Sequence, residues 1–403
     1  MPPTVVIVAT LDTKGEEVGY LRQLIQQSGC STIAIDVGTL NPPAVQPDIP
    51  RETVALRAES SIEELREVKD RRVSVETMIR GASALVNDLH GEGKLSGILS
   101  VGGGTGTHIG MGIMRTLPLG VPKLMVSTVA SRDMSQLIGT KDIAVMHSVT
   151  DILGLNAVTK RILANAAAAV AGMARSAAPI AAEKPIIGLT SFGFITEGAM
   201  RVKGILESLG YDVAPFHANG TGGMAMEDLV DQGLISGVLD LALHEFSDAM
   251  YDGYCAGIGP RRLIAAGERG IPQVIVPGGL DCIVLEFDSE ETKPAYLKDR
   301  KVFWYDFRSG VRTSVEDVTA LADTISEKLN LATGPTRVVI PRRGWSEADC
   351  KGGPLYDPGA NQAFVDELRS RLKPGIEIVE VDAHINAPEF STAVCSILDS
   401  LMK

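Results

Sequence analysis

GILSVGGGTGTH (residues 97–108) runs from an apolar, strand-like segment straight into four glycines and two threonines. Glycines at the end of a parallel strand let backbone N–H groups and the dipole of the following helix face an anion, of which phosphate is the simplest. The threonine hydroxyls add donors. The segment therefore predicts a strand-to-helix turn that is either an anion-binding loop or a tight turn without a ligand.

Outward from this segment, short β-branched runs alternate with longer amphipathic stretches along the whole chain. Near-continuous apolar strands separated by helices are typical of parallel sheets that are covered on both faces, so the predicted fold class is α/β. The predicted strands lie at 5–10, 32–37, 97–101, 123–128, 186–190, 237–242, 273–278, 337–341 and 376–381, and predicted helices include 15–28, 75–90 and 157–176.

Two pairs of segments repeat in the same order. GVPKLMVSTVAS (120–131) resembles GIPQVIVPGGLD (270–281), and LSGILSVG (95–102) resembles ISGVLDLA (235–242). The repeats predict two internally similar, Rossmann-like lobes at 1–178 and 185–403, joined near 176–185, where alanine, proline and a loss of periodicity mark a connection. We expect a cleft between the lobes, lined by the strand ends of both.

Composition excludes several classes of protein. The 403-residue chain is 45% hydrophobic and 22% charged, as in ordinary globular proteins. Its formal charge of −12 argues against a nucleic-acid partner. The five cysteines form no C-x-x-C pair, and no apolar run reaches the ~18 residues of a membrane span. These features predict a cytoplasmic protein without a membrane partner.

The glycine loop matches neither common nucleotide motif. No Lys-Ser or Lys-Thr follows it, as a Walker A sequence requires, and Ile109 stands where the dinucleotide pattern needs its third glycine. Two other loops strengthen the case for a phosphate. TLDTKGEE (10–17) places Lys14 near a helix start, and STVASRD (127–133) offers the hydroxyls of Ser127, Thr128 and Ser131.

The second lobe contributes candidate catalytic residues. In FHANGTGGMAME (216–227), His217 and Glu227 are a candidate general base and its partner, although the glycines are equally explained as turns. PGGLDC (277–282) places Asp281 and Cys282 at another strand end, and Cys282 is interpreted as a buried small side chain. LHEFSD (243–248) carries residue types that bind metals, but their spacing matches no standard motif.

The chain resembles the Tm-one-like ATP-binding family in a series of segments. In chain order these are LDTKGEE, the glycine loop, PKLMVSTVAS, KDIAVMHSVTDILGLN (141–156), FHANGTGGMAMEDL, GVLDL, GIPQVIVPGGLD and DPGANQAF (357–364). The resemblance spans nearly the whole chain. It implies two Rossmann-like subdomains, ATP with Mg²⁺ in the N-terminal one, and dimers or higher homo-oligomers. It places these residues near the phosphates: Lys14, Gly103, Gly104, Thr105 and Gly106, with Ser127, Thr128 and Ser131 on a neighbouring loop. Thr107 is a further candidate for the cofactor site because of its hydroxyl in the glycine loop. Arg132, His244 and Cys282 depart from the family's pattern.

These observations predict an ATP-binding protein, most simply an enzyme that acts on a small metabolite in the cleft between the lobes. Its candidate catalytic residues are His217, Glu227 and Asp281. Two alternatives stay open. One is a regulatory module in which ATP is bound but not turned over. The other is a hydrolase or lyase whose glycine loop holds an anionic metabolite instead of ATP.

Overall fold

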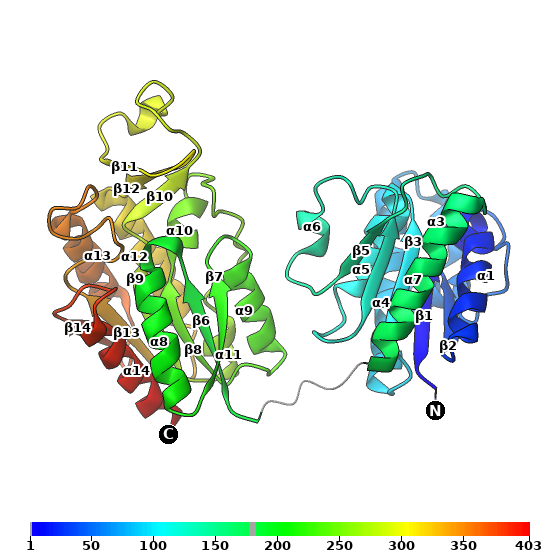
Figure 1. The fold of residues 1–403 in the computed structure, drawn as a ribbon, viewed down its shortest axis with the longest axis horizontal. Coiled ribbons are helices and arrows are strands. Elements are labelled where there is room, and N and C mark those ends of the chain that lie inside the picture. Colours follow the sequence, from blue (N-terminus) through cyan, green and yellow to red (C-terminus); the bar gives the residue numbers. More distant parts are fainter. Residues whose placement is uncertain (1, 177–182) are drawn as a thin grey trace. The chain divides into compact units, whose positions relative to one another are not determined.

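The computed structural model describes residues 2–176 and 183–403. The chain divides into two compact units, residues 1–180 and 181–403, called here the first and second units (Figure 1). Most of the predicted connection at 176–185 lies outside the described residues.

The first unit is built on a five-stranded parallel sheet with the strand order β2-β1-β3-β4-β5. The strands are β1 (Thr4–Ala9), β2 (Ser31–Asp36), β3 (Gly97–Gly102), β4 (Lys123–Ser127) and β5 (Ala144–His147). Every residue of β3 is buried, as its largely apolar sequence predicts for a central parallel strand.

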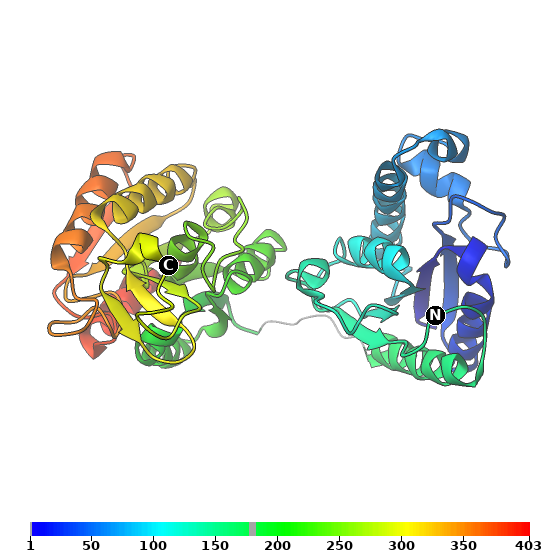
Figure 2. The same ribbon diagram turned by 90° about the horizontal axis from the view of Figure 1, so that it is seen from above.

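Helices cover both faces of this sheet. Apolar side chains of α1 (Leu11–Gln27) and α7 (Ala157–Ser176) form one hydrophobic core with one face of β1 and β3. On the other face of the sheet, apolar side chains of the helices from α2 (Arg51–Arg57) to α5 (Gly104–Met114) form a second core. The remaining helices are α3 (Ile62–Glu67), α4 (Arg71–Gly91) and α6 (Ser135–Ile138). Figure 2 shows α7 and α4 on opposite sides of the sheet.

The second unit contains a six-stranded parallel sheet with the strand order β14-β13-β9-β8-β6-β7. Its strands are β6 (Ile186–Ser191), β7 (Asp212–His217), β8 (Gly237–Ala242), β9 (Gln273–Gly278), β13 (Thr336–Pro341) and β14 (Glu377–Val381). A small antiparallel sheet of β10 (Cys282–Leu285), β12 (Ser309–Arg312) and β11 (Val302–Trp304) follows β9.

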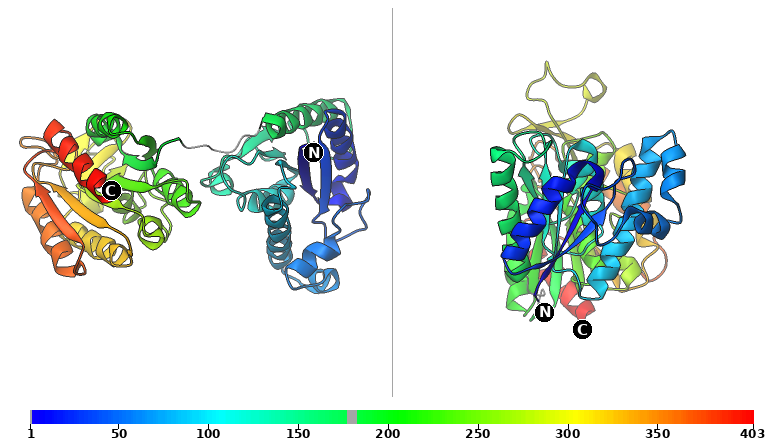
Figure 3. Two further views of the ribbon diagram at one scale, coloured as in Figure 1. Left: turned by 90° about the horizontal axis from the view of Figure 1, so that it is seen from below. Right: turned by 90° about the vertical axis from the view of Figure 1, so that its right-hand side faces the viewer.

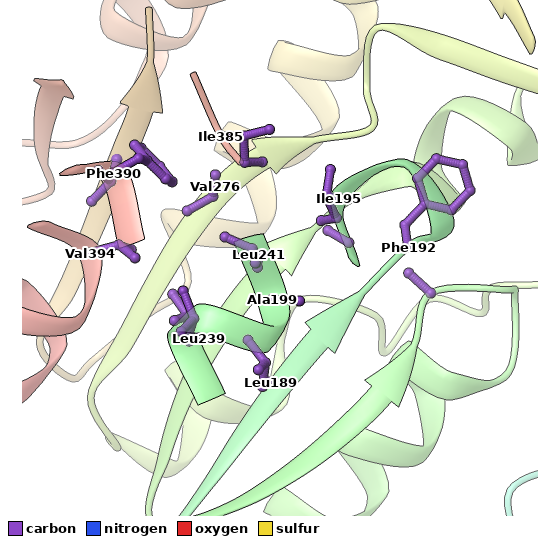
Figure 4. Close-up of a cluster of buried hydrophobic side chains, with 14 of the residues drawn as sticks. Leu189, Phe192, Ile195, Ala199, Leu239, Leu241, Val276, Ile385, Phe390 and Val394 are labelled. Atoms are coloured by element: carbon purple, nitrogen blue, oxygen red, sulfur yellow. The ribbon is translucent and has the colours of Figure 1, made fainter. Parts of the chain in front are cut away.

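The core of the second unit also lies on both faces of its sheet. Helices α8 (Thr196–Ser208) and α14 (Pro388–Met402) lie on the same side (Figure 3), where their apolar residues pack on alternate side chains of β6, β8 and β9 (Figure 4). The opposite face is covered by α9 (Gly222–Asp231), α10 (His244–Ala249), α11 (Ala265–Arg269), α12 (Val315–Leu329) and α13 (Pro358–Arg371).

The predicted fold class is confirmed, because both units are α/β with parallel sheets. The repeated segments occupy equivalent strands: LSGILSVG and ISGVLDLA form β3 and β8, and the two segments that follow form their neighbours β4 and β9. When the parallel strands are numbered by their order along each unit, the first sheet has the order 2-1-3-4-5. The second sheet has the same order with one additional strand at the end.

All nine predicted strands are present, each within one residue of its predicted bounds. The sequence patterns missed β5, β7 and the three antiparallel strands. In the part of the chain that the structure describes, no helix combines the length and apolarity needed to cross a membrane.

Candidate functional site

The first unit holds a pocket at the carboxyl ends of β1, β2 and β3, with a volume of about 250 Å³. Its polar walls come from the β1–α1 turn, the loop after β2, the glycine loop and the first turn of α4. The lining residues are Thr10, Asp12, Thr13, Lys14, Val37, Gly38, Thr39, Leu40, Arg71, Ser74, Val75, Met78, Gly103, Gly104, Thr105, Gly106 and Ile109.

The position of this pocket follows from the strand order. The connections leaving β1 and β3 run to opposite sides, so the crevice between these strands is the topological switch point of a 2-1-3-4-5 sheet, where ligands of doubly wound folds bind. The helices α1 and α5 both start at this edge, and the first-turn N–H groups of a helix have no intrahelical acceptor. The pocket is therefore suited to an anion.

The glycine loop leaves open space where it faces the pocket. A Cβ added to Gly104 would meet no atom within 4 Å, and one on Gly103 would meet only Thr128 Oγ1, at 3.8 Å. By contrast, a Cβ on Gly102 would lie 2.7 Å from the Gly106 Cα. Gly102 is thus required for the turn itself, whereas packing within the protein does not require glycine at Gly103 or Gly104.

The hydroxyl groups predicted to meet a phosphate fall into three sets. Thr105 is exposed and lines the pocket. Thr107 and Ser127 are fully buried, with their hydroxyl oxygens 2.7 Å apart, so these two groups hold α5 against β4. Thr128 is half-buried and Ser131 is exposed, and neither lines the pocket. A cofactor role for these five residues stays a prediction.

Lys14 is half-buried and lines the pocket. Its φ and ψ of −124° and 15° interrupt the helical geometry of α1, and its ammonium donates a hydrogen bond to the Ile152 carbonyl. Because an ammonium carries three donors, this bond leaves others for a ligand. Lys14 is thus held at the pocket by a contact from the loop after β5.

Acidic residues near the pocket were not predicted as site residues. Asp12 lines the pocket, and its Oδ2 accepts hydrogen bonds from the N–H groups of Leu40 and Asn41 at 3.3 and 3.2 Å. Asp36, at the end of β2, is buried and accepts from the Leu11 and Gly38 N–H groups at 3.0 and 2.9 Å. Burial raises the pKa of Asp36. The two carboxylates fix the loop after β2 against the start of α1.

The second unit also has a glycine loop, which follows β7, and this loop is filled from within the protein. The Glu245 Oε1 accepts hydrogen bonds from the Gly220 and Gly223 N–H groups at 2.9 and 3.2 Å. A Cβ on Gly223 would lie 2.1 Å from Glu245 Oε2 and 2.2 Å from Arg262 Nε. In this loop, the chain's own carboxylate takes the place that a bound anion takes in other glycine loops.

Family models match both units. Residues 3–179 match the N-terminal domain and residues 184–402 the C-terminal domain of the uncharacterised protein family UPF0261. The chain belongs to this family.

Relatives of this UPF0261 protein match it over nearly its full length. A UPF0261 protein of Clostridium tetani is 41% identical and one of Rhizobium meliloti is 38% identical, with 100% and 96% of each chain covered. The ToMV susceptible protein tm-1(GCR26) of Solanum lycopersicum is 32% identical over all of this chain and 56% of its own length. The predicted Tm-one-like relationship is confirmed.

A buried ion network in the second unit of this UPF0261 protein contains one of the predicted catalytic residues. Arg262 is fully buried and contacts three carboxylates: Asp240 with both terminal nitrogens, Glu245 at 2.7 Å and Glu227 at 3.4 Å. Glu227 also accepts from the backbone N–H groups of Leu263, Ile264 and Ala265 at 2.6, 3.1 and 2.7 Å. Burial raises the pKa of Glu227, and Arg262 opposes that rise.

The three predicted catalytic residues lie in different surroundings. His217 is exposed at the end of β7, and no hydrogen bond between described residues joins it to Glu227, which holds the start of α11. Asp281 is fully buried; its Oδ2 accepts from the Ser346 hydroxyl at 2.6 Å, and burial together with Asp349 raises its pKa to about 6. Their catalytic roles, and the predicted cleft between the lobes, stay predictions.

Proposed function

We propose that the first unit binds ATP, with its phosphates on the glycine loop between β3 and α5. One observation carries the proposal: Gly104, where an added Cβ would meet no atom within 4 Å, lines a pocket at the switch point of the sheet. A glycine that the fold does not need is explained by a ligand that approaches the backbone closely.

The charges lining the pocket suit a magnesium-bound nucleotide. Lys14 and Arg71 supply two cations, and the first-turn N–H groups of α5 supply donors for phosphate oxygens. Asp12 is the one carboxylate among the described lining residues, and carboxylates together with phosphates are the usual ligands of Mg²⁺. The residues present therefore fit ATP with Mg²⁺. The pocket's volume of about 250 Å³ is slightly below the ~300 Å³ of small ligand sites, so part of the nucleotide extends outside it.

The proposal extends to a cytoplasmic homo-oligomer that uses ATP in a reaction on a small metabolite. The free cysteines, four of them buried, suit a reducing compartment. His217, exposed at the end of β7, is the predicted catalytic group best placed to exchange protons with solvent. Turnover of sugar acids and acyl compounds with ATP, and none without it, distinguishes this enzyme from a regulatory module that only binds ATP.

Calorimetric titration of the full chain tests the binding proposal. Mg-ATP is expected to bind at a single site, and inorganic phosphate or simple carboxylates are expected to bind much more weakly because they contact only the glycine loop. Binding of phosphate or a carboxylate without binding of Mg-ATP would instead favour an anionic metabolite as the ligand.

The Lys14→Ala variant is expected to bind Mg-ATP more weakly by about 1.5–3 kcal/mol, the range for a hydrogen bond to a charged group, or roughly 10- to 150-fold in Kd. The same titration measures this change. Lys160→Ala, which removes an exposed lysine of α7 outside the pocket, is the matched control and is expected to leave the affinity unchanged. Equal affinities of the two variants would remove Lys14 from the site.

A further inference from the structure

The switch point of the second sheet, between β6 and β8, holds a buried group of residues with metal-binding side chains. His244 and Asp248 lie on α10, which begins two residues after β8 ends, and Cys255 follows in the next loop. The exposed fractions of the three residues are 0%, 0% and 4%. One ligand atom from each lies within 4.8 Å of the other two.

The environment of the imidazole fixes which nitrogen carries its hydrogen. His244 Nδ1 lies 3.0 Å from the Gly279 carbonyl oxygen, and because a carbonyl only accepts, Nδ1 is the donor. The ring of Phe192 stacks on the imidazole at 3.8 Å between centroids. The ring is therefore held with Nε2 toward Asp248. Proteins commonly orient a metal-binding histidine in this way, by a hydrogen bond from its other ring nitrogen to a backbone carbonyl.

His244 Nε2 is fully buried and has no hydrogen-bond partner among the described residues. The carboxylate oxygen Asp248 Oδ2 is 3.3 Å away. The carboxylate cannot easily turn, because its oxygens also accept from the backbone N–H groups of Val284 and Cys255, both at 2.7 Å. A nitrogen, an oxygen and a sulfur thus lie around one buried point, an arrangement that a cation would satisfy.

A proton on Nε2 provides one such cation, and it favours an ion pair with Asp248. Burial lowers the pKa of His244, but Asp248 and the nearby Cys282 outweigh that effect and raise it well above the ordinary value. A proton forms one directed bond, however, and satisfies only one of the other two donors. A divalent ion satisfies nitrogen, oxygen and sulfur together.

We propose that His244, Asp248 and Cys255 bind a divalent transition-metal ion, with Zn²⁺ as the ion that best suits one imidazole, one carboxylate and one thiolate. Zinc–ligand bonds of 2.0–2.3 Å place tetrahedral donors roughly 3.4–3.7 Å apart, so small side-chain movements close the group around the ion. The site needs no part of the nucleotide proposal, since it lies wholly in the second unit. Glu245, the other acidic residue of the segment 243–248 near this point, is engaged by Arg262 instead.

Metal analysis and cobalt spectroscopy of untagged full-length protein test the proposal. Protein refolded with Zn²⁺ is expected to retain one zinc ion per chain after gel filtration. Protein refolded with Co²⁺ is expected to show a thiolate-to-cobalt charge-transfer band in the near ultraviolet. Cys255→Ala is expected to lose the band and the bound zinc. Cys395→Ala, which alters another buried cysteine of the second unit, is expected to keep both.

Wild-type protein without stoichiometric metal, or a charge-transfer band that survives in Cys255→Ala, would overturn the proposal and leave a proton as the cation. Should Cys255→Ala fail to fold, X-ray absorption of zinc-loaded wild-type protein decides. A first shell with one sulfur supports the site, and a shell of only oxygen and nitrogen overturns it.

Discussion

The Gly104→Val variant is expected to lose Mg-ATP binding while its first unit stays folded. The valine side chain would occupy the open space in front of the glycine loop, where nothing in the protein lies within 4 Å of the Cβ. Gly104 is the first residue of α5, and its φ is not positive, so valine introduces no backbone strain.

The expected loss of Mg-ATP affinity is large because the valine side chain separates several backbone N–H donors from the phosphates at once. Each hydrogen bond to a charged group contributes about 1.5–3 kcal/mol. Losing two of them weakens binding by about 3 kcal/mol or more, which is roughly 150-fold in Kd. Titration calorimetry with Mg-ATP measures the affinity, and thermal unfolding reports whether the unit is intact.

Gly172→Val is the matched control for this substitution. Gly172 lies on α7 of the same unit, outside the pocket, and a Cβ there also meets nothing within 4 Å. This variant is expected to bind Mg-ATP like the wild type. If Gly104→Val bound Mg-ATP with wild-type affinity, the glycine loop would be a turn without a ligand.

Arg262→Met is expected to destabilise the second unit by about 3–5 kcal/mol, the cost of removing one partner from a buried ion pair. The substitution leaves the carboxylates of Asp240, Glu245 and Glu227 buried without their shared cation. Urea unfolding of the full chain, followed by tryptophan fluorescence, measures the change, because both tryptophans, Trp304 and Trp345, lie in the second unit.

The cost of this substitution is expected to depend on pH. Burial already raises the pKa of Glu227, and without Arg262, which opposes that rise, its folded-state pKa lies further above the unfolded value. Stability from such groups is present below the unfolded pKa, near 4, and is lost as pH rises through the folded pKa. The destabilisation should therefore be smaller at about pH 5 than at about pH 8.

The neighbouring arginine provides the control. Arg261 forms ion pairs with Asp231 and Glu268, but its side chain is 43% exposed, so Arg261→Met is expected to cost about 1 kcal/mol or less. Equal losses for the two variants, or a loss for Arg262→Met that does not change with pH, would mean that the network does not act as a buried charge cluster.

The structural features that a single continuous stretch of sequence encodes could be predicted from the sequence. The central strands are near-continuous apolar runs, and the glycine loop directly follows one of them. The missed strands lack that signal: β5 is a short, partly exposed edge strand, and β7 is an edge strand that contains Pro215, which a central strand would not tolerate.

The rest of the candidate site depends on contacts that only the fold creates. Arg71 and Ser74 reach the pocket from α4, about 30 residues before the glycine loop, with no local motif to mark them. His217 and Glu227 lie close in sequence, yet Glu227 is directed into the core toward Arg262, 35 positions further along the chain. Proximity in sequence suggested a pair that the folded unit does not bond together.

A crystal structure of the full chain with Mg²⁺ and a non-hydrolysable ATP analogue tests the central claim most directly. We expect the phosphates to lie at the carboxyl ends of β1 and β3, within hydrogen-bonding distance of the backbone N–H groups of residues 104–106 and of Lys14 Nζ. Nucleotide bound elsewhere on the chain, with the glycine loop vacant, would contradict the proposed site.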